Sequence, residues 1–378
     1  MNNKMVLEVN VDDLNMGGVY GLVKNVITNN FDRSIKIDIA AIEHFANTKN
    51  IELFNERGTQ VFYVGYDGNK LLKQIKCYSN LRKLIKNNNY EYVHVHADVA
   101  NKLFTSGLAA KYSGAKKVIL HSHAAGVDGK HRKVKKYIHK FCRRFLKYIA
   151  TDYVACSEVA AKWMFPNVES EKIVIVNNGV DLDKFRFDAA VRYQIRNKLG
   201  IKDEILLGHV GRFCYQKNHE YFIEILKEIR KRNIKAKLLL IGEGPDEQDF
   251  KEKIRKEQLD DMVIFYGTTN KVQELFMAMD VFLLPSHFEG LPIVGVEAQA
   301  SGLPVILSDQ IDRSAKLTDS VEFLDIKLNT AAKWVDVILK FRKKTDDRKC
   351  AYYFLKKDHF KNVDIKAISK DIVYIFKE

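Results

Sequence analysis

The fold follows from one stretch of the chain, residues 287–304, which reads HFEGLPIVGVEAQASGLP. Before it stands DVFLLPS, an apolar segment of strand length that ends at a proline and a serine. Proline is tolerated at the first helical position, so a helix can begin at Pro292, and Gly302 followed by Pro304 supplies a stop signal. The pattern predicts strand, loop, short helix and strand. In a parallel sheet such a loop lies at the carboxyl edge, where open α/β folds bind ligands.

This loop and helix offer two kinds of group to a ligand. The backbone N–H groups of Gly290, Leu291 and the start of the helix after Pro292 can face an anion. Glu289 precedes the helix and Glu297 lies inside it, eight positions on. A carboxylate can accept two hydrogen bonds from a vicinal diol, as a ribose or a hexose presents. The alternative is a helix-start glutamate that favours the helix dipole and a second glutamate that is merely solvated.

The composition limits the class of protein. The 378 residues are enough for two ordinary domains with full cores. The net charge of +14 favours anionic partners, which include nucleic acid, acidic membrane and phosphorylated ligands. Five scattered cysteines without a CxxC motif predict reduced thiols, and no apolar run approaches membrane-spanning length. A cytoplasmic protein without a signal peptide is therefore expected.

The first half alternates between strand and helix patterns, which predicts a doubly wound parallel sheet. A pair of glycines, Gly17 and Gly18, follows the first strand and can let the backbone approach a phosphate or a sugar, although such a pair is more often only a turn. The strand candidates of this half are residues 6–11, 35–42, 60–64, 92–96, 118–123, 151–158 and 172–181.

Two pairs of histidines close strands in this half: His94 with His96, and His121 with His123. Spacing of two places both members of a pair on one face of a strand. Metal binding is one option, but no carboxylate or cysteine partner is evident at ligand spacing. A histidine at a strand end can instead bind a hydroxyl or a phosphate, or be a satisfied, partly buried side chain.

A strongly basic segment follows, residues 129–150, with no acidic residue between Asp128 and Asp152. Its apolar residues fall on one helical stripe, which alone would indicate a helix facing the core. The dense positive charge over 130–147 favours contact with an anionic membrane surface or a lipid phosphate. Nucleic acid is the rival partner, but no DNA- or RNA-binding motif accompanies the segment, so none is expected.

The second half opens with a buried strand, ILLGHVG, that ends at Gly211. Arg212 and Lys217 lie in the loop that follows, where an arginine fork and a lysine point charge could hold a pyrophosphate. A further strand ends in Gly-Glu-Gly-Pro at Glu243, a signal that is weak on its own. Beyond residues 305–309, another strand candidate, the chain is expected to be mainly helical.

With these motifs in view, the sequence resembles the retaining glycosyltransferases of GT-B fold (family 4, group 1) that include glycogen synthase. It is most similar to bacterial capsular and exopolysaccharide transferases. The motifs that carry the resemblance are GRFxxxKN at residues 211–218 and a glutamate, seven residues and a second glutamate at Glu289 and Glu297. One departure is Val19-Tyr20 after the glycine pair, where Ala-Glu is more common.

The resemblance implies an α/β fold of two Rossmann-like, doubly wound parallel-sheet domains facing a cleft. Residues 1–185 would form the acceptor-side domain, 186–358 the donor domain, and 359–378 a helix that crosses back. Arg212 and Lys217 would bind the donor phosphates, Glu289 and His123 the transferred sugar, and Glu297 the ribose. Gly17 and Gly18 would line the cleft, Gly211, Gly290, Leu291 and Pro292 the diphosphate, and Glu243 the base.

The implied activity is transfer of a sugar, with retention, from a nucleotide diphosphate donor such as a UDP-sugar to a glycan or lipid-linked acceptor. No metal and no other cofactor is expected, and the enzyme would work on the inner face of the cell membrane, in capsule or exopolysaccharide synthesis. Two rivals remain at this point: a nucleotide-sugar epimerase of the same fold, and a non-catalytic partner subunit.

Overall fold

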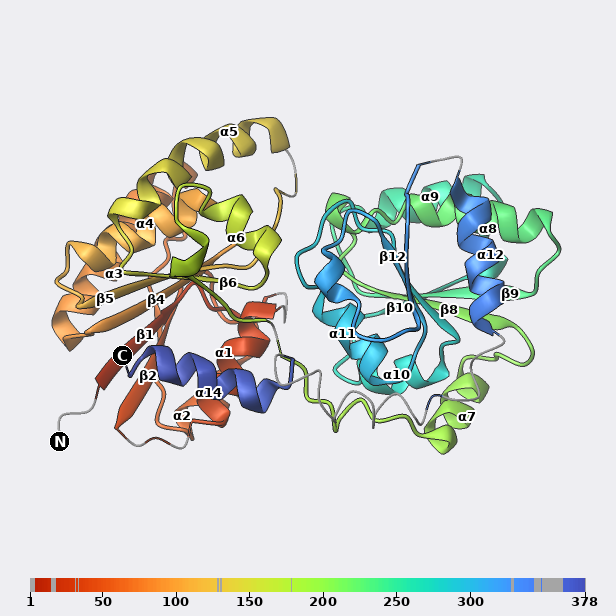
Figure 1. Ribbon diagram of the computed structural model, residues 1–378, viewed down its shortest axis with the longest axis horizontal. Helices are drawn as coiled ribbons and strands as arrows, with labels where there is room; N and C mark the ends of the chain where they lie inside the picture. The colour runs from red at the N-terminus through yellow and green to blue at the C-terminus, as the bar shows by residue number, and fades with distance from the viewer. Residues whose placement is uncertain are drawn as a thin grey trace. The chain divides into compact units, whose positions relative to one another are not determined.

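The chain divides into two compact units. Unit 1 comprises Met1–Val127, His131–Gly179 and Asn362–Glu378, and unit 2 comprises Asp128–Lys130 and Val180–Lys361. The computed structural model describes residues 4–14, 18–30, 32, 34–127, 129, 131–177, 179–327, 330–342, 348 and 363–377. Each unit is built around its own parallel sheet (Figure 1).

The sheet of unit 1 has seven strands in the order β3-β2-β1-β4-β5-β6-β7. Every recorded pairing within it is parallel, as the alternation of strand and helix predicts. Its strands are β1 (Lys4–Val9), β2 (Ile35–Ala41), β3 (Val61–Tyr63), β4 (Tyr92–Ala97), β5 (Lys117–Ser122), β6 (Asp152–Ala155) and β7 (Ile173–Ile175).

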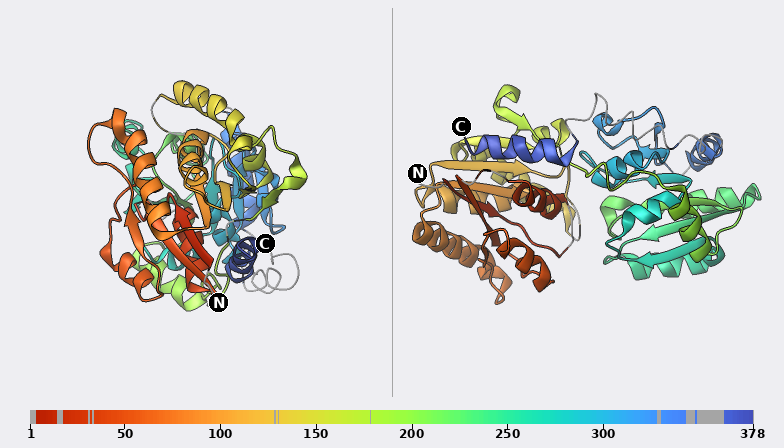
Figure 2. Two further views of the ribbon diagram at one scale, coloured as in Figure 1. Left: turned by 90° about the vertical axis from the view of Figure 1, so that its left-hand side faces the viewer. Right: turned by 90° about the horizontal axis from the view of Figure 1, so that it is seen from below.

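Helices cover both faces of this sheet. Helices α1 (Gly18–Thr28) and α14 (Ile365–Ile375) bury Val23 and Ile368 against one face, while α3 (Lys70–Asn88) and α4 (Ala100–Lys111) bury Leu81 and Leu103 against the other. Figure 2 shows α14, the blue C-terminal helix, lying along this unit. The other helical segments of unit 1 are α2 (Thr48–Asn55), α5 (Arg132–Cys142), η1 (Arg143–Tyr148), α6 (Glu158–Met164) and η2 (Ser170–Lys172).

The sheet of unit 2 is also parallel and has six strands in the order β10-β9-β8-β11-β12-β13. Its strands are β8 (Ile205–Val210), β9 (Ala236–Ile241), β10 (Val263–Gly267), β11 (Val281–Leu284), β12 (Val305–Ser308) and β13 (Val321–Leu324). The sequence pattern predicts β8 to β12, including residues 263–270 for β10. It misses β13, because an acid interrupts VEFL and three of its four residues are only partly buried.

The helices of unit 2 shield a core in which Phe222 and Trp334 are fully buried. They are α7 (Ala189–Lys198), α8 (Tyr221–Lys231), α9 (Glu247–Lys256), α10 (Val272–Ala278), α11 (Ile293–Ala300) and α12 (Ala331–Arg342), with short 3-10 turns η3 (Tyr215–Lys217), η4 (Asp260–Met262) and η5 (Arg313–Ala315). Among the described residues, no helix has the length and apolar character needed to cross a bilayer.

Both sheets reverse their winding direction beside their first strand. In unit 1 the reversal falls between β1 and β4, and in unit 2 between β8 and β11. Loops that leave two such strands diverge to opposite faces, so the carboxyl ends of the strands open a crevice where α/β sheets bind ligands. The two architectures match the predicted doubly wound sheets, and these two switch points are the places to look for function.

Candidate active site

The loop after β8 is fixed by backbone contacts at the switch point of unit 2. The N–H of Gly211 donates to the carbonyl of Ile241 at 2.9 Å, which continues the pairing of β8 with β9. The chain then makes the turn η3, and Asn218 closes it with a left-handed backbone (φ 52°). The Asn218 side-chain amide donates to the carbonyl of Pro285 at 3.0 Å. This loop is thereby tied to the one that follows β11.

The loop after β11 makes further contacts with the loop after β8. The N–H of His287 donates to the carbonyl of Gln216 at 2.8 Å, and the Gln216 side chain donates to the carbonyl of Phe288 at 3.2 Å. The rings of Tyr215 and His287 stack with their centroids 4.3 Å apart. The two loops, residues 211–218 and 285–291, therefore pack against each other along the carboxyl edge of β8 and β11. This pair of loops is called the ledge below.

An ion pair joins the two loops. The Nζ of Lys217 lies 2.7 Å from Oε1 of Glu289, and the exposed fractions of the two side chains are only 15% and 10%. The hydroxyl of Ser286 donates to the same carboxylate oxygen at 3.2 Å. Arg212 follows β8 in the same loop as Lys217, and its side chain is exposed. The structure thus brings Lys217 and Glu289, which lie 72 positions apart in the sequence, into direct contact.

At two positions of this edge, Gly242 and Gly244, there is no room for a side chain. A Cβ on Gly242 would lie 2.3 Å from the carbonyl oxygen of Gly211, and a Cβ on Gly244 would lie 2.3 Å from that of Phe213. The N–H of Phe213 also donates to the carbonyl of Glu243 at 3.1 Å, while the Glu243 side chain is exposed. The Gly-x-Gly sequence after β9 therefore serves the close approach of two loops.

Helix α11 starts directly after Pro292, as the sequence predicts. Gly290, Leu291 and Pro292 are buried, and the carbonyl of Pro292 accepts the first bonds of the helix, from the N–H of Gly295 among others. Glu297 lies in the middle of this helix and is partly exposed. Burial raises the pKa of Glu297 to about 7, against a smaller opposing effect of Lys184.

A residue that the sequence pattern did not single out, Asp280, holds β8 and β11 together. Its carboxylate accepts from the N–H of Leu206 at 2.7 Å, and its own N–H donates to the carbonyl of Leu206 at 2.8 Å. Arg192 and Arg196 of α7 both contact the same carboxylate. The signal in the sequence was an acid directly before a buried strand, but its partners lie more than 70 positions away.

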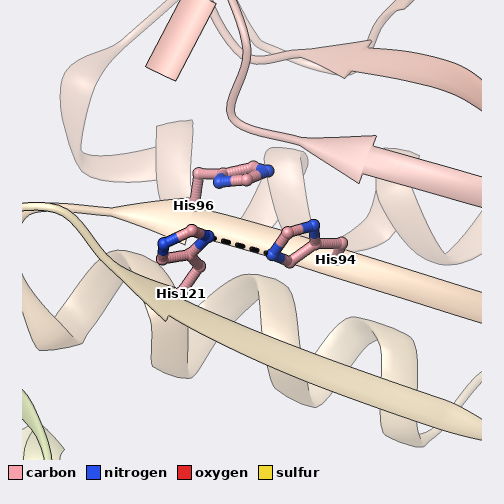
Figure 3. Close-up of side chains that lie close together, drawn as sticks. All are labelled: His94, His96 and His121. Atoms are coloured by element: carbon pink, nitrogen blue, oxygen red, sulfur yellow. Dashed lines mark hydrogen bonds between the residues drawn. The ribbon is translucent and has the colours of Figure 1, made fainter. Parts of the chain in front are cut away.

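The four predicted histidines of unit 1 come together at the other switch point. His94 and His121 approach at 3.2 Å between ring nitrogens, and His96 and His123 approach at 2.8 Å (Figure 3 shows the first of these contacts). The residue that the sequence reading missed is Glu8 of β1, whose Oε2 lies 2.6 Å from a nitrogen of His96. Glu8 is hidden in the sequence as the only acid in the apolar strand KMVLEV.

These buried groups perturb each other's protonation. Burial, reinforced by His94, lowers the pKa of His96 to about 4. Burial also lowers the pKa of His121 and His123 well below their ordinary value. For Glu8, burial would raise the pKa, but the neighbouring His94 and His96 outweigh it and lower the pKa to about 2. Of the glycine pair, Gly18 begins α1, and Gly17 lies outside the described residues.

Family models match both halves of the chain. The model described as Glycosyltransferase Family 4 matches residues 35–184, and the one described as Glycosyl transferases group 1 matches residues 191–348. The chain is 32% identical over 315 residues to EpsF of Bacillus subtilis (strain 168), the name of which proposes a glycosyltransferase; the match covers 82% of this chain and 80% of that one. The chain belongs to the glycosyltransferases of group 1 and family 4.

Two further proteins are similar to this glycosyltransferase, one in sequence and one in fold. It is 29% identical over 287 residues, 74% of its length and 72% of the relative, to an Escherichia coli protein named UDP-Gal:alpha-D-GlcNAc-diphosphoundecaprenol alpha-1,3-galactosyltransferase. Its fold is similar to that of Anabaena HepE in complex with UDP-glucose, with a TM-score of 0.77, 16% identity and 99% coverage of both chains. The fold is GT-B, as the sequence predicts.

The predicted basic segment forms α5 and then the 3-10 turn η1, and the apolar stripe along both does not face the core. Tyr137 and Phe141 of α5 and Tyr148 of η1 are 76%, 63% and 63% exposed. The inward contact of α5 comes instead from His139, which stacks on Trp163 at 4.1 Å between ring centroids. Apolar and basic side chains are thus presented together on the surface of unit 1.

The raised pKa of Glu297 predicts a pH-dependent stability. In the folded chain its pKa of about 7 lies above the ordinary value of 4.5. Its contribution to the free energy of unfolding is therefore fully present below about pH 4.5 and lost as the pH rises through about 7. Glu297→Gln stays neutral, so its free energy of unfolding, measured by urea denaturation, should fall less than that of the wild type between about pH 5 and about pH 8.

Glu252→Gln, at an exposed position of α9, is the matched control and should behave as the wild type does. An equal pH dependence in all three proteins would contradict the burial-driven shift at Glu297.

Proposed function

We propose that this glycosyltransferase moves a sugar from a nucleotide diphosphate donor, of the UDP-sugar type, to a glycan or lipid-linked saccharide during synthesis of a cell-surface polysaccharide. The reaction proceeds with retention of anomeric configuration. The observation that carries the proposal is the ledge of unit 2, where Lys217 and Glu289 pair at the switch point between β8 and β11 and Arg212 is exposed in the same loop as Lys217.

The proposed mechanism is electrostatic. As the glycosidic bond to the diphosphate breaks, negative charge grows on the leaving phosphate oxygens. Lys217 is held at the strand edge by Glu289, and Arg212 is exposed in the same loop, so both cations are proposed to meet this charge. The backbone N–H groups of Gly290 and Leu291 and the start of α11 after Pro292 are proposed to add donors for the same anion, whereas the N–H of Gly211 is already bonded to Ile241. Turnover is expected without added metal ion or other cofactor.

The two glutamates have different proposed partners. Glu289 is bonded to Lys217 and Ser286 and is proposed to contact the transferred sugar, with His123 of unit 1. Glu297 is partly exposed on α11 and is proposed to accept hydrogen bonds from the ribose hydroxyls. Glu243 is exposed after β9 and is proposed to lie near the nucleotide base. Gly17 and Gly18 are proposed to line the site on the acceptor side.

The substrate class is supported by relatives. The E. coli relative is named for a UDP-galactose donor and a diphosphoundecaprenol-linked acceptor. Others are named for amylovoran biosynthesis in Erwinia amylovora and for capsular polysaccharide biosynthesis in Staphylococcus aureus. A lipid-linked saccharide acceptor and a role in capsule or exopolysaccharide synthesis are the corresponding proposals for this chain.

The test is a transfer assay with a panel of UDP-sugars and a polyprenyl diphosphate saccharide, followed by NMR of the product. The expected product carries the anomeric configuration of the donor, and Arg212→Ala should lower turnover by about 30- to 1000-fold, or about 2–4 kcal/mol. Arg255→Ala, an exposed arginine on α9, is the matched control and should leave turnover unchanged.

Other outcomes would contradict the proposal in distinct ways. An inverted product would refute retention. Conversion of the donor to an epimer without acceptor would favour an epimerase. Near wild-type turnover in folded Arg212→Ala would refute its role at the phosphates.

We further propose that α5 and η1 hold the enzyme at the anionic inner face of the membrane. The exposed Tyr137 and Phe141 can enter the boundary between headgroups and acyl chains, while the surrounding cations, each contributing on the order of 1 kcal/mol, face anionic lipid. A lipid-linked acceptor would then lie within the same leaflet.

Vesicle sedimentation tests this membrane contact. Lys133, Lys136 and Lys140 are exposed on α5, and changing all three to Glu should abolish binding to vesicles that contain anionic lipid. The control carries the same change of charge at three exposed lysines of α3 and should still bind: Lys76, Lys83 and Lys86. Binding of the wild type should fall as salt rises, because the attraction is screened beyond about 8–10 Å. Equal binding of both variants would contradict a role for α5.

A further inference from the structure

The cluster at the switch point of unit 1 is a set of potential metal ligands. His94 and His96 come from β4, His121 from β5, and each offers a ring nitrogen such that all three atoms lie within 4.8 Å of one another. Glu8 of β1 lies next to them, with its Oε2 3.0 Å from Nδ1 of His94 and 2.6 Å from Nε2 of His96. All four side chains are at most 1% exposed.

The strand register explains why these side chains meet. Glu8 is the partner of His94 in the pairing of β1 with β4, and His96 is the partner of His121 in the pairing of β4 with β5. Partners in adjacent parallel strands point to the same face, so three neighbouring strands place their side chains in one patch. Ligands on strands are held more firmly than ligands on loops, which favours a preformed site.

The cluster is incompletely satisfied by hydrogen bonds. Among the described residues, Oε1 of Glu8 and Nε2 of His121 are buried without a hydrogen-bond partner. The ion pairs found for Glu8 in that part of the chain join it to histidines alone, with no lysine or arginine. A buried carboxylate and buried imidazole nitrogens in this state are costly unless they are paired or coordinate a metal.

We propose that His94, His96 and His121 bind one divalent first-row transition-metal ion, with Zn²⁺ as the reference ion, and that Glu8 holds the ring of His94 through its other nitrogen. Imidazole nitrogens suit Zn²⁺ and its neighbours, whereas Mg²⁺ and Ca²⁺ prefer oxygen alone. Ligand atoms around a tetrahedral Zn²⁺, at about 2.0–2.2 Å from it, lie about 3.3 Å apart. Nε2 of His94 and Nδ1 of His121 already lie 3.2 Å apart.

The surroundings of the cluster suit such an ion. A metal-ligating histidine commonly uses its other nitrogen for a hydrogen bond that fixes the ring. In this chain Nδ1 of His96 lies 2.8 Å from Nε2 of His123, which is itself partly exposed. On the other side the ring of Phe376, just after α14, meets the ring of His94 edge-on at 5.8 Å. The ion would therefore join β4 and β5 beneath the C-terminal helix and orient His123.

This site is separate from the donor chemistry proposed for unit 2. Its role is to stabilise unit 1 and to fix the position of His123, since an ion that binds only the folded chain stabilises it. The metal site is supported by the geometry of unit 1 alone, and it does not depend on the proposed transferase mechanism.

The experiment uses the full chain without a histidine tag, stripped of metal by a chelator and dialysed. Zn²⁺ is titrated in competition with a chromophoric chelator, and Co²⁺ is added separately to record its visible absorption, which is intense only at low coordination number. The expected result is one high-affinity ion per chain, a raised melting temperature with Zn²⁺, and an intense Co²⁺ spectrum.

Variants separate this site from weak surface binding. His121→Asn should lower the Zn²⁺ affinity by at least 100-fold, and Glu8→Gln, which removes the partner of the His94 ring, should lower it by about 10- to 100-fold. Glu8→Gln keeps the shape of the side chain so that folding is preserved. The matched control is His139→Asn, because His139 is also a fully buried histidine of unit 1 but bonds the N–H of Ala100 outside the cluster. It should retain the affinity of the wild type.

Circular dichroism of each metal-free protein establishes that it is folded. Absence of a stoichiometric high-affinity site in the wild type would overturn the proposal and leave a purely hydrogen-bonded cluster. Unchanged Zn²⁺ affinity in both folded His121→Asn and folded Glu8→Gln would overturn it as well.

Discussion

The ion pair between Lys217 and Glu289 is the contact on which the proposed donor site depends. It joins the loops that leave β8 and β11, the two strands on either side of the switch point in unit 2. A lysine at this edge without a carboxylate would be free to move, and a carboxylate this buried without a cation would be costly. Together they form a fixed pair of charges at the place where the sheet opens.

The rest of unit 2 keeps these loops in register. Asp280 fastens the start of β11 to Leu206 of β8, so the carboxyl ends of both strands are level. Gly242 and Gly244 allow the loop after β9 to lie directly against the loop after β8. The proposed chemistry therefore depends on side chains whose positions are set by backbone geometry, as is common in α/β folds.

The sequence predicted the strands and the local motifs because these depend on short-range patterns. The buried strand before Arg212 and the helix start at Pro292 both follow from the order of neighbouring residues. The pairing of Lys217 with Glu289, and of Glu8 with His94 and His96, could not be read locally, since strand order and register bring these residues together.

The sequence did not show, for a different reason, that the apolar face of α5 points to solvent. An amphipathic stripe indicates which side of a helix is apolar, but it does not indicate whether that side meets the core or the surface. Here His139, a single residue off the stripe, provides the inward contact. For β13 the difficulty was polarity, because an acid interrupts VEFL, whereas the equally short β11 is the continuous apolar run VFLL.

The most direct test of the central claim, that the edge of β8 and β11 binds a nucleotide diphosphate, is hydrogen–deuterium exchange with and without UDP. The account predicts slower exchange in peptides that cover residues 211–218 and 285–297, since a diphosphate bound there orders both loops, with little change in the α9 peptide. Protection confined to other parts of the chain, or no protection at saturating UDP, would contradict it.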